Sequence, residues 1–452
     1  MKVPLSLLLC APLLALAAES DTPVKPGGEW QKIETKLVPI AQPRQILSPG
    51  LFDHELLKVV TLPKDGTPAD LGLPHAGKDK NGKEYPALTA RIAQHFVWVD
   101  FNGDGRASAD ETRSVEADGY TDVFSCTLHY EDGTAAPYSF RLKSLGDDKY
   151  AVQRACARVA EVNGQKLVLL DENGNGKYNE ADKDALIAGD APVAFVGKYV
   201  QLGNKFFELL VHEAGTLIEV RPVPEQNFPL GYVDIFEKHK APQKAENLHT
   251  HMIIISGAEG SFAFDERRRK IKVPAGAYDI TFGLFERAKE IVYMKKGEKT
   301  TFTVEGEKTA APAWGADVEA RFTVKAGPKP VAKPEPKANP EKAVDENFII
   351  VSPPTFVGAG SEQYFPENYK IIPVTAAIAQ VMADAKMRAD RSIPVGSHRY
   401  DVLPNGDLAP TTFKPARNYN DEYEITVDYN SGILGSVNTK QRFRFTYRKP
   451  VK

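Results

Sequence analysis

Residues 96–111 read FVWVDFNGDGRASADE. The first four, Phe96 to Val99, are aromatic or β-branched, which is typical of a β-strand. The following twelve place oxygen-bearing side chains at regular intervals. Gly105 stands at the sixth of these positions, where a sharp turn needs backbone angles that only glycine adopts cheaply. The stretch therefore predicts a strand that runs into a tight, oxygen-lined loop.

The spacing of the oxygens in residues 100–111 fits one calcium ion. Side-chain oxygens fall at positions one, three and five; position seven needs only its carbonyl, position nine can hold a water, and position twelve can give both carboxylate oxygens. The predicted ligands, in that order, are Asp100, Asn102, Asp104, Arg106, Ser108 and Glu111. The loop resembles the calcium loop of the EF-hand family and of its bacterial relatives such as dockerins. The resemblance implies calcium binding, and a polar turn between two elements is the alternative.

Residues 171–182, DENGNGKYNEAD, repeat the arrangement. The predicted ligands are Asp171, Asn173, Asn175, Lys177 through its carbonyl, Asn179 and Asp182. The stretch departs from the family pattern twice, because position five is the neutral Asn175 and position twelve is the shorter Asp182. Fewer charges predict weaker calcium binding. An Asn- and Gly-rich turn of the kind common in β proteins is the alternative.

The segments that flank the loops predict strands. Asn163-Gly164 is a hairpin-turn pair, and residues 166–170, KLVLL, reach the second loop directly afterwards. This segment is too short for a useful helix. An EF-hand proper needs a helix on each side of its loop. We therefore expect strand-flanked calcium loops at sheet edges, and not a calmodulin-like switch whose helices swing apart.

The composition agrees with a β-rich chain of several domains. The 452 residues are 26% charged and 42% hydrophobic, and 34 Gly and 33 Pro suit frequent turns. A net charge of −3 without a long basic block outside one linker argues against a nucleic-acid partner. We predict a mainly β fold of several β-sandwich-like domains that carry the EF-hand-type loops. It has few short helices, with one candidate helix at residues 376–388.

The N-terminus predicts export. Met1-Lys2, an apolar run to Leu16 and the small residues at 15–17 form a signal peptide that is cut after Ala17. No later stretch is long and apolar enough to span a bilayer. After cleavage only Cys126 and Cys156 remain. In an oxidising compartment they predict a disulfide worth about 3 kcal/mol, with two free thiols as the alternative.

The domain organisation follows from the spacing of strand-like runs. It comprises a signal peptide at 1–17, a flexible lead at 18–45, a β-rich domain with both loops and the disulfide at 46–245, a β-sandwich at 246–325, a Pro/Lys-rich linker at 326–345 and a C-terminal β-sandwich at 346–452. Residues 273–280, VPAGAYDI, resemble the P-x-G-x-Y turn of prealbumin-like and Ig-like sandwich domains, which implies that an aromatic enters the core. Residues 423–429 alternate strictly, as in a sandwich strand with one buried face.

None of the serine-hydrolase, P-loop or dinucleotide fingerprints occurs in the sequence. We therefore expect an exported calcium-binding protein without identified catalytic machinery, with a structural, adhesive or scaffolding role at the cell surface or in the periplasm. Its expected partners are calcium and a cell-surface polymer or another protein. Two alternatives stay open. A carbohydrate-binding module would show a row of exposed aromatics on a flat sheet face, and a secreted hydrolase would show a pocket with carboxylates of raised pKa.

Overall fold

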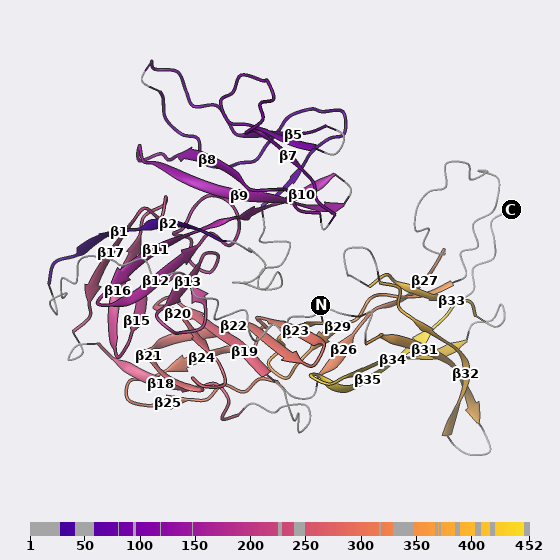
Figure 1. Ribbon diagram of the computed structural model, residues 1–452. Helices are drawn as coiled ribbons and strands as arrows, with labels where there is room; N and C mark the ends of the chain where they lie inside the picture. Colours follow the sequence, from indigo (N-terminus) through magenta and orange to yellow (C-terminus); the bar gives the residue numbers. More distant parts are fainter. Residues whose placement is uncertain are drawn as a thin grey trace. The chain divides into compact units, whose positions relative to one another are not determined.

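A computed structural model describes residues 28–40, 58–79, 81–93, 96–117, 119–146, 148–224, 228–238, 249–315, 318–328, 348–366, 369, 372–384, 389–402, 408–415 and 421–446. All regular secondary structure within these residues is β, in strands β1–β35 (Figure 1), which confirms the predicted mainly β fold. In this part of the chain no helix is long and apolar enough to cross a membrane. The predicted signal peptide and residues 329–345 of the predicted linker lie outside the described residues.

The chain divides into two compact units. Unit 1 comprises Met1–Asp234, Met252–Ile280 and Phe302–Ala310, and unit 2 comprises Ile235–His251, Thr281–Thr301 and Ala311–Lys452. The residues that we expected to form a separate middle sandwich, 246–325, are thus shared between the two units.

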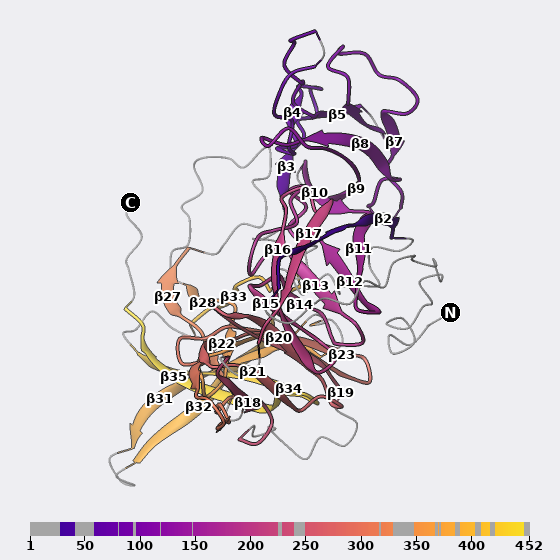
Figure 2. The ribbon, with the colours of Figure 1, turned by 90° about the vertical axis from the view of Figure 1, so that its left-hand side faces the viewer.

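Four antiparallel sheets account for most of unit 1. The first has the order β1-β17-β16-β15 (Gln31–Glu34, Leu217–Pro222, Lys205–Val211, Tyr199–Leu202). The second has the order β3-β10-β9-β8 (Val59–Thr61, Lys149–Arg154, Ala135–Gly146, Phe124–His129). The third is β14-β13-β12-β11-β2 (Ala194–Phe195, Ala185–Ala188, Gln165–Leu170, Cys156–Val162, Lys36–Pro39). The fourth is β4-β5-β6-β7 (Ala69–Asp70, Thr89–Ala93, Phe96–Asp100, Thr112–Ser114). Figure 2 shows the same strands in a view turned by 90°.

Side chains from all four of these sheets form one apolar core. Alternate residues of most of these strands point into it, as the period of two requires. Examples from four strands are Val97 and Val99, Phe140 and Leu142, Leu167 and Leu169, and Ile218 and Val220. The two candidate loops extend from strands of this core, so their ends are held by buried residues.

The remaining strands of unit 1 belong to the middle of the chain. They are β18 (Leu230–Asp234) between β21 (Lys270–Pro274) and β25 (Thr309–Ala310), then β20 (Gly260–Phe264) and β24 (Thr301–Val304). β19 (His249–Gly257) and β22 (Gly276–Arg287) have residues in both units. The P-x-G-x-Y turn joins β21 to β22. Tyr278 is buried there and donates a hydrogen bond of 2.9 Å from its hydroxyl to the Pro274 carbonyl, which confirms that the turn delivers an aromatic into the core.

Unit 2 contains three groups of strands. They are β23-β30-β29-β26 (Glu290–Lys295, Gln363–Pro366, Thr355–Val357, Glu319–Arg321), β27-β28-β33 (Val324–Gly327, Phe348–Val351, Thr411–Phe413) and β32-β31-β34-β35 (Ala389–Arg399, Thr375–Asp384, Glu422–Ser431, Gly435–Arg444). The predicted alternation of residues 423–429 is confirmed. Tyr423, Ile425, Val427 and Tyr429 are buried, and the residues between them are half-buried.

Two predictions about local structure are wrong. The candidate helix at 376–388 is strand β31 as far as Asp384, and residues 385–388 lie outside the described residues. Pairing with β32 on one side and β34 on the other overrides the helix propensity of the alanines, and Ala376 and Ile378 are buried on one face. The lead expected to be flexible contains β1 and β2, which pair with β17 and β11.

Candidate metal centre

Both candidate loops connect the two strands of an antiparallel hairpin. Residues 100–111, called loop 1, lead from β6 to β7, in which Trp98 pairs with Thr112. Residues 171–182, called loop 2, leave β12, and the chain returns in β13, where Leu170 pairs with Ala185. The predicted strand-flanked loops are therefore confirmed. The strands fix the separation of the loop ends, and the loop sequences fix the turns between them.

Loop 1 is folded by hydrogen bonds from backbone amides to its own side chains. Asp100 accepts from the amides of Gly103 (2.6 Å) and Gly105 (3.0 Å), which are at positions four and six. Asn102 accepts from the amide at position five (2.8 Å), and Asp104 accepts from the amide at position seven (2.7 Å). Gly105 has a φ of 70°, as predicted for position six. These bonds aim the backbone donors at the carboxylates and leave further oxygen lone pairs available.

Glu111 closes loop 1. Its Oε1 accepts from the Phe101 amide at 3.0 Å, and its Oε2 accepts from the Ser108 hydroxyl at 2.7 Å and from the Trp98 indole at 3.4 Å. Asp100 and Glu111 are buried, whereas the residues from Asn102 to Asp110 are exposed. The structure thus brings the predicted acids at positions one and twelve to the base of an otherwise open loop.

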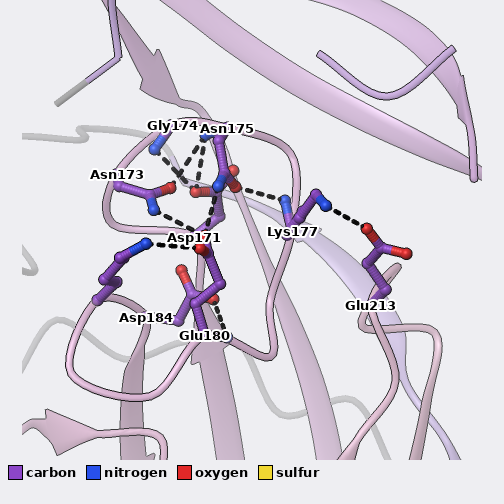
Figure 3. Close-up of polar contacts among 9 residues, drawn as sticks. Asp171, Asn173, Gly174, Asn175, Lys177, Glu180, Asp184 and Glu213 are labelled. Carbon is purple, nitrogen blue, oxygen red and sulfur yellow. Dashed lines mark hydrogen bonds and ion pairs between the residues drawn. The ribbon is translucent and has the colours of Figure 1, made fainter. Parts of the chain in front are cut away.

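Loop 2 repeats the hydrogen bonds of loop 1 (Figure 3). Asp171 accepts from the amides of Gly174 (2.8 Å) and Gly176 (2.7 Å), again at positions four and six. Asn173 accepts from the amide at position five (3.2 Å), and Asn175 accepts from the amide at position seven (2.9 Å). Gly176 has a φ of 85°. The two loops therefore have the same backbone arrangement despite their different side chains.

The surroundings of loop 2 differ from those of loop 1, because loop 2 is packed into the core of unit 1. Tyr138 on β9 donates its hydroxyl to Asp171 at 2.7 Å, and Tyr130 donates to the Gly176 carbonyl at 2.7 Å. A Cβ at Gly176 would lie 2.7 Å from Leu128 and Pro74, whereas a Cβ at Gly105 would meet nothing within 4 Å. Loop 2 is thus held by protein contacts that loop 1 lacks at this position.

The predicted ligands at the end of loop 2 do not come together with the others. Asn179 and Asp182 are exposed, and Asp182 has a φ of 59°. Glu180 takes their place, because its Oε2 accepts from the side-chain amide of Asn173 at 2.8 Å and also from that of Asn175. Sequence analysis missed Glu180, since it occupies position ten, where the EF-hand pattern places no ligand.

Asp184 is a second acid that sequence analysis missed. It is fully buried immediately before β13, and its Oδ2 accepts from the Glu180 amide at 2.8 Å. Its other oxygen, Oδ1, is buried without a hydrogen-bond partner. The sequence shows only that Asp184 directly precedes the apolar run 185–187. An acid at such a place occurs in solvated turns as well as at buried sites, so the sequence alone does not predict its burial.

Burial changes the acidity of the carboxyl groups behind loop 2. Removal from water and the nearby Asp171 charge raise the pKa of Asp184 to about 9. Burial also raises the pKa of Glu172 to about 7, although Arg154 opposes the effect. Burial raises the pKa of Asp171 in the same way. For Glu180, burial acts to raise the pKa, but hydrogen bonds from Lys183, Asn173 and Asn175 together lower it.

A hollow of about 620 Å³ lies beside loop 2. Its lining includes Asn173, Asn175 and Lys177 of the loop together with Glu131 and Glu213. The Lys177 ammonium forms an ion pair of 2.6 Å with Glu213. The three carboxyl groups with raised pKa values, those of Asp171, Glu172 and Asp184, do not line the hollow. The hollow therefore gives solvent access to the loop but lacks the feature expected of a hydrolase pocket.

The disulfide predicted between Cys126 and Cys156 is absent, because both are free thiols in the structure. Burial raises the pKa of Cys126 to about 12, and the neighbouring Cys156 adds to the shift. The Cys156 sulfur lies 3.4 Å from both the amide and the carbonyl of Ser139 and 3.6 Å from the Tyr178 hydroxyl. An even number of cysteines could not reveal this geometry.

Among the described residues, no three His, Cys, Asp or Glu side chains form a group that could hold a metal ion by themselves. Calcium loops of this spacing also take ligands from Asn side chains and backbone carbonyls, so such a group is not a requirement for them. Comparison of the chain with family models, with curated proteins and with solved structures gave no match.

Proposed function

We propose that the chain is an exported calcium-binding protein in which loop 1 and loop 2 each take one calcium ion. Bound calcium would fix the two hairpin connections of unit 1 and give the protein a structural role, such as adhesion or scaffolding. The residues in question are those of the two loops, with Asp100 and Glu111 as the main acids of loop 1.

One observation carries the proposal. In both loops the first aspartate accepts from the amides at positions four and six, and the side chains at positions three and five accept from the amides two residues later. These contacts hold the side chains of positions one, three and five in place before an ion arrives. Preorganisation of oxygen ligands lowers the entropic cost of binding.

The charges of loop 1 support a cation there. The carboxylates of Asp100 and Glu111 are both buried at the base of the loop, and Phe101 connects them through its backbone. Two buried acids in one loop repel each other unless a cation lies between or beside them. Calcium is the hard cation that such a set of oxygens prefers.

The proposal is tested by calorimetric titration of the calcium-free full chain. We expect two binding events, the tighter one from loop 1 because more of its predicted ligands are acids. Replacing Asp100→Ala together with Glu111→Ala should abolish the tighter event. The matched control is Asp110→Ala with Glu116→Ala, which removes two exposed carboxylates nearby and should leave both events. An unchanged isotherm in the first variant, or an equal loss in the control, would refute the assignment of loop 1.

A further inference from the structure

We infer that loop 2 binds its cation through Glu180, positioned by Asp184, and not through the position-twelve residue Asp182. The inference rests on the proposed function, because it concerns the ligands of the same loop. It differs from the EF-hand pattern, in which the acid that closes the loop stands at position twelve.

The side-chain contacts within loop 2 point to Glu180 as the acid that binds the cation. The side-chain amides of Asn173 and Asn175 both donate to its Oε2, so the groups at positions three, five and ten meet at one point. Figure 3 shows the Glu180 side chain beside Asp171 and Asp184 on the inner side of the turn. Asp182 is exposed. A calcium ion at this meeting point would replace these amide donors and take oxygens from Asp171 and Glu180.

Asp184 provides an independent indication of a cation. Its side chain is fully buried, and Oδ1 has no hydrogen-bond partner although Oδ2 holds the Glu180 amide. A buried carboxyl oxygen without a hydrogen-bond partner is costly, and a nearby cation would remove much of that cost. Asp184 also fixes the backbone of Glu180, so it acts as a positioning residue for the ligand.

Two features near Glu180 bear on calcium binding: the hollow beside loop 2 and the ammonium group of Lys183. Asn173 and Asn175, the two residues whose amides contact Glu180, line the hollow beside loop 2. The Lys183 ammonium, half-exposed, donates to Glu180 Oε1 at 2.8 Å. A calcium ion that uses both Glu180 oxygens must displace this lysine. Lys183 is therefore expected to weaken calcium binding in the unaltered chain.

The test compares two variants that each neutralise one acid, Glu180→Gln and Asp182→Asn, in the full chain with Asp100→Ala and Glu111→Ala. Loop 2 is then the remaining site, and its calcium affinity is measured by titration. We expect Glu180→Gln to weaken binding by about tenfold or more and Asp182→Asn to leave it nearly unchanged. A larger loss from Asp182→Asn, or equal losses, would overturn the inference while the proposed function stands. Absence of binding before either change would instead contradict the proposed calcium site of loop 2.

A gain-of-affinity variant keeps the inference falsifiable if Glu180→Gln folds poorly. Lys183→Met removes the competing ammonium from an exposed position and should tighten calcium binding to loop 2 several-fold. The gain should vanish when Glu180→Gln is added, because the lysine would act only through Glu180. A Lys183→Met variant with unchanged or weaker affinity would contradict the role of Glu180.

Discussion

Loop 1 is exposed from Asn102 to Asp110, whereas loop 2 is buried from Asp171 to Gly174, although the two follow the same path of hydrogen bonds. In loop 1 the order comes from the loop's own side chains, and the acids at its base are the charges that a cation would neutralise. In loop 2, hydrogen bonds from Tyr138 of β9 and from Tyr130, directly after β8, add to this order. The comparison teaches that one pattern of backbone hydrogen bonds can form both in an exposed loop, through its own side chains, and in a loop packed into the core.

Because loop 2 is buried and loop 1 is exposed, the same substitution at position six should lower the free energy of unfolding by different amounts in the two loops. Gly176→Ala should lower the free energy of unfolding by about 2 to 4 kcal/mol, because positive φ strains alanine and the added methyl group would clash with Leu128 and Pro74. Gly105→Ala carries the backbone strain alone and should cost about 1 kcal/mol. Urea-induced unfolding of the two variants in chelator measures both. Equal losses would show that loop 2 is no more tightly packed than loop 1.

A separate effect should appear in the pH dependence of the calcium-free chain. Because the folded-state pKa of Asp184 is raised to about 9 from 3.8, its proton is bound more tightly in the folded chain. Its contribution therefore favours folding below about pH 4 and is lost as the pH rises through about 9, and Glu172, with a pKa of about 7, acts in the same direction. Melting temperatures in chelator should fall across this window.

Asp184→Asn isolates the effect of this one carboxyl group. The variant should melt with a shallower dependence on pH, because asparagine has no proton to release. A variant that follows the same slope as the unaltered chain would mean that Asp184 is not the titrating group. In that case burial of loop 2 would have no measurable effect on the protonation of Asp184. The difference between the exposed loop 1 and the buried loop 2 would then not extend to the pKa values of their acids.

Part of this architecture could be predicted from sequence, because it depends on local pattern. The alternation of residues 423–429, the hairpin pair Asn163-Gly164 and the oxygen spacing of both loops each determine structure within a few residues. Residues 376–378 also alternate in burial, but the many alanines of this segment hid the strand that two neighbouring strands impose.

The rest depends on contacts that are distant in sequence. Tyr138 forms a hydrogen bond with Asp171, 33 residues further along the chain, and Tyr130 forms one with Gly176, 46 residues further along. Because these partners are so far apart in sequence, no local pattern predicts that loop 2 is buried. The contact of Glu180 with Asn173 and the exposure of Asp182, which has a positive φ, likewise depend on how the chain turns before β13. Family analogy counts positions along the loop and places no ligand at position ten, so it does not point to the contact between Glu180 and Asn173.

The central claim is that cations occupy both oxygen-lined hairpin connections of unit 1. The most direct measurement is equilibrium dialysis of the full chain against millimolar calcium, followed by metal analysis of the protein. The account predicts two calcium ions per chain, falling to one when Asp100→Ala and Glu111→Ala are introduced together. A chain recovered without bound calcium would contradict it.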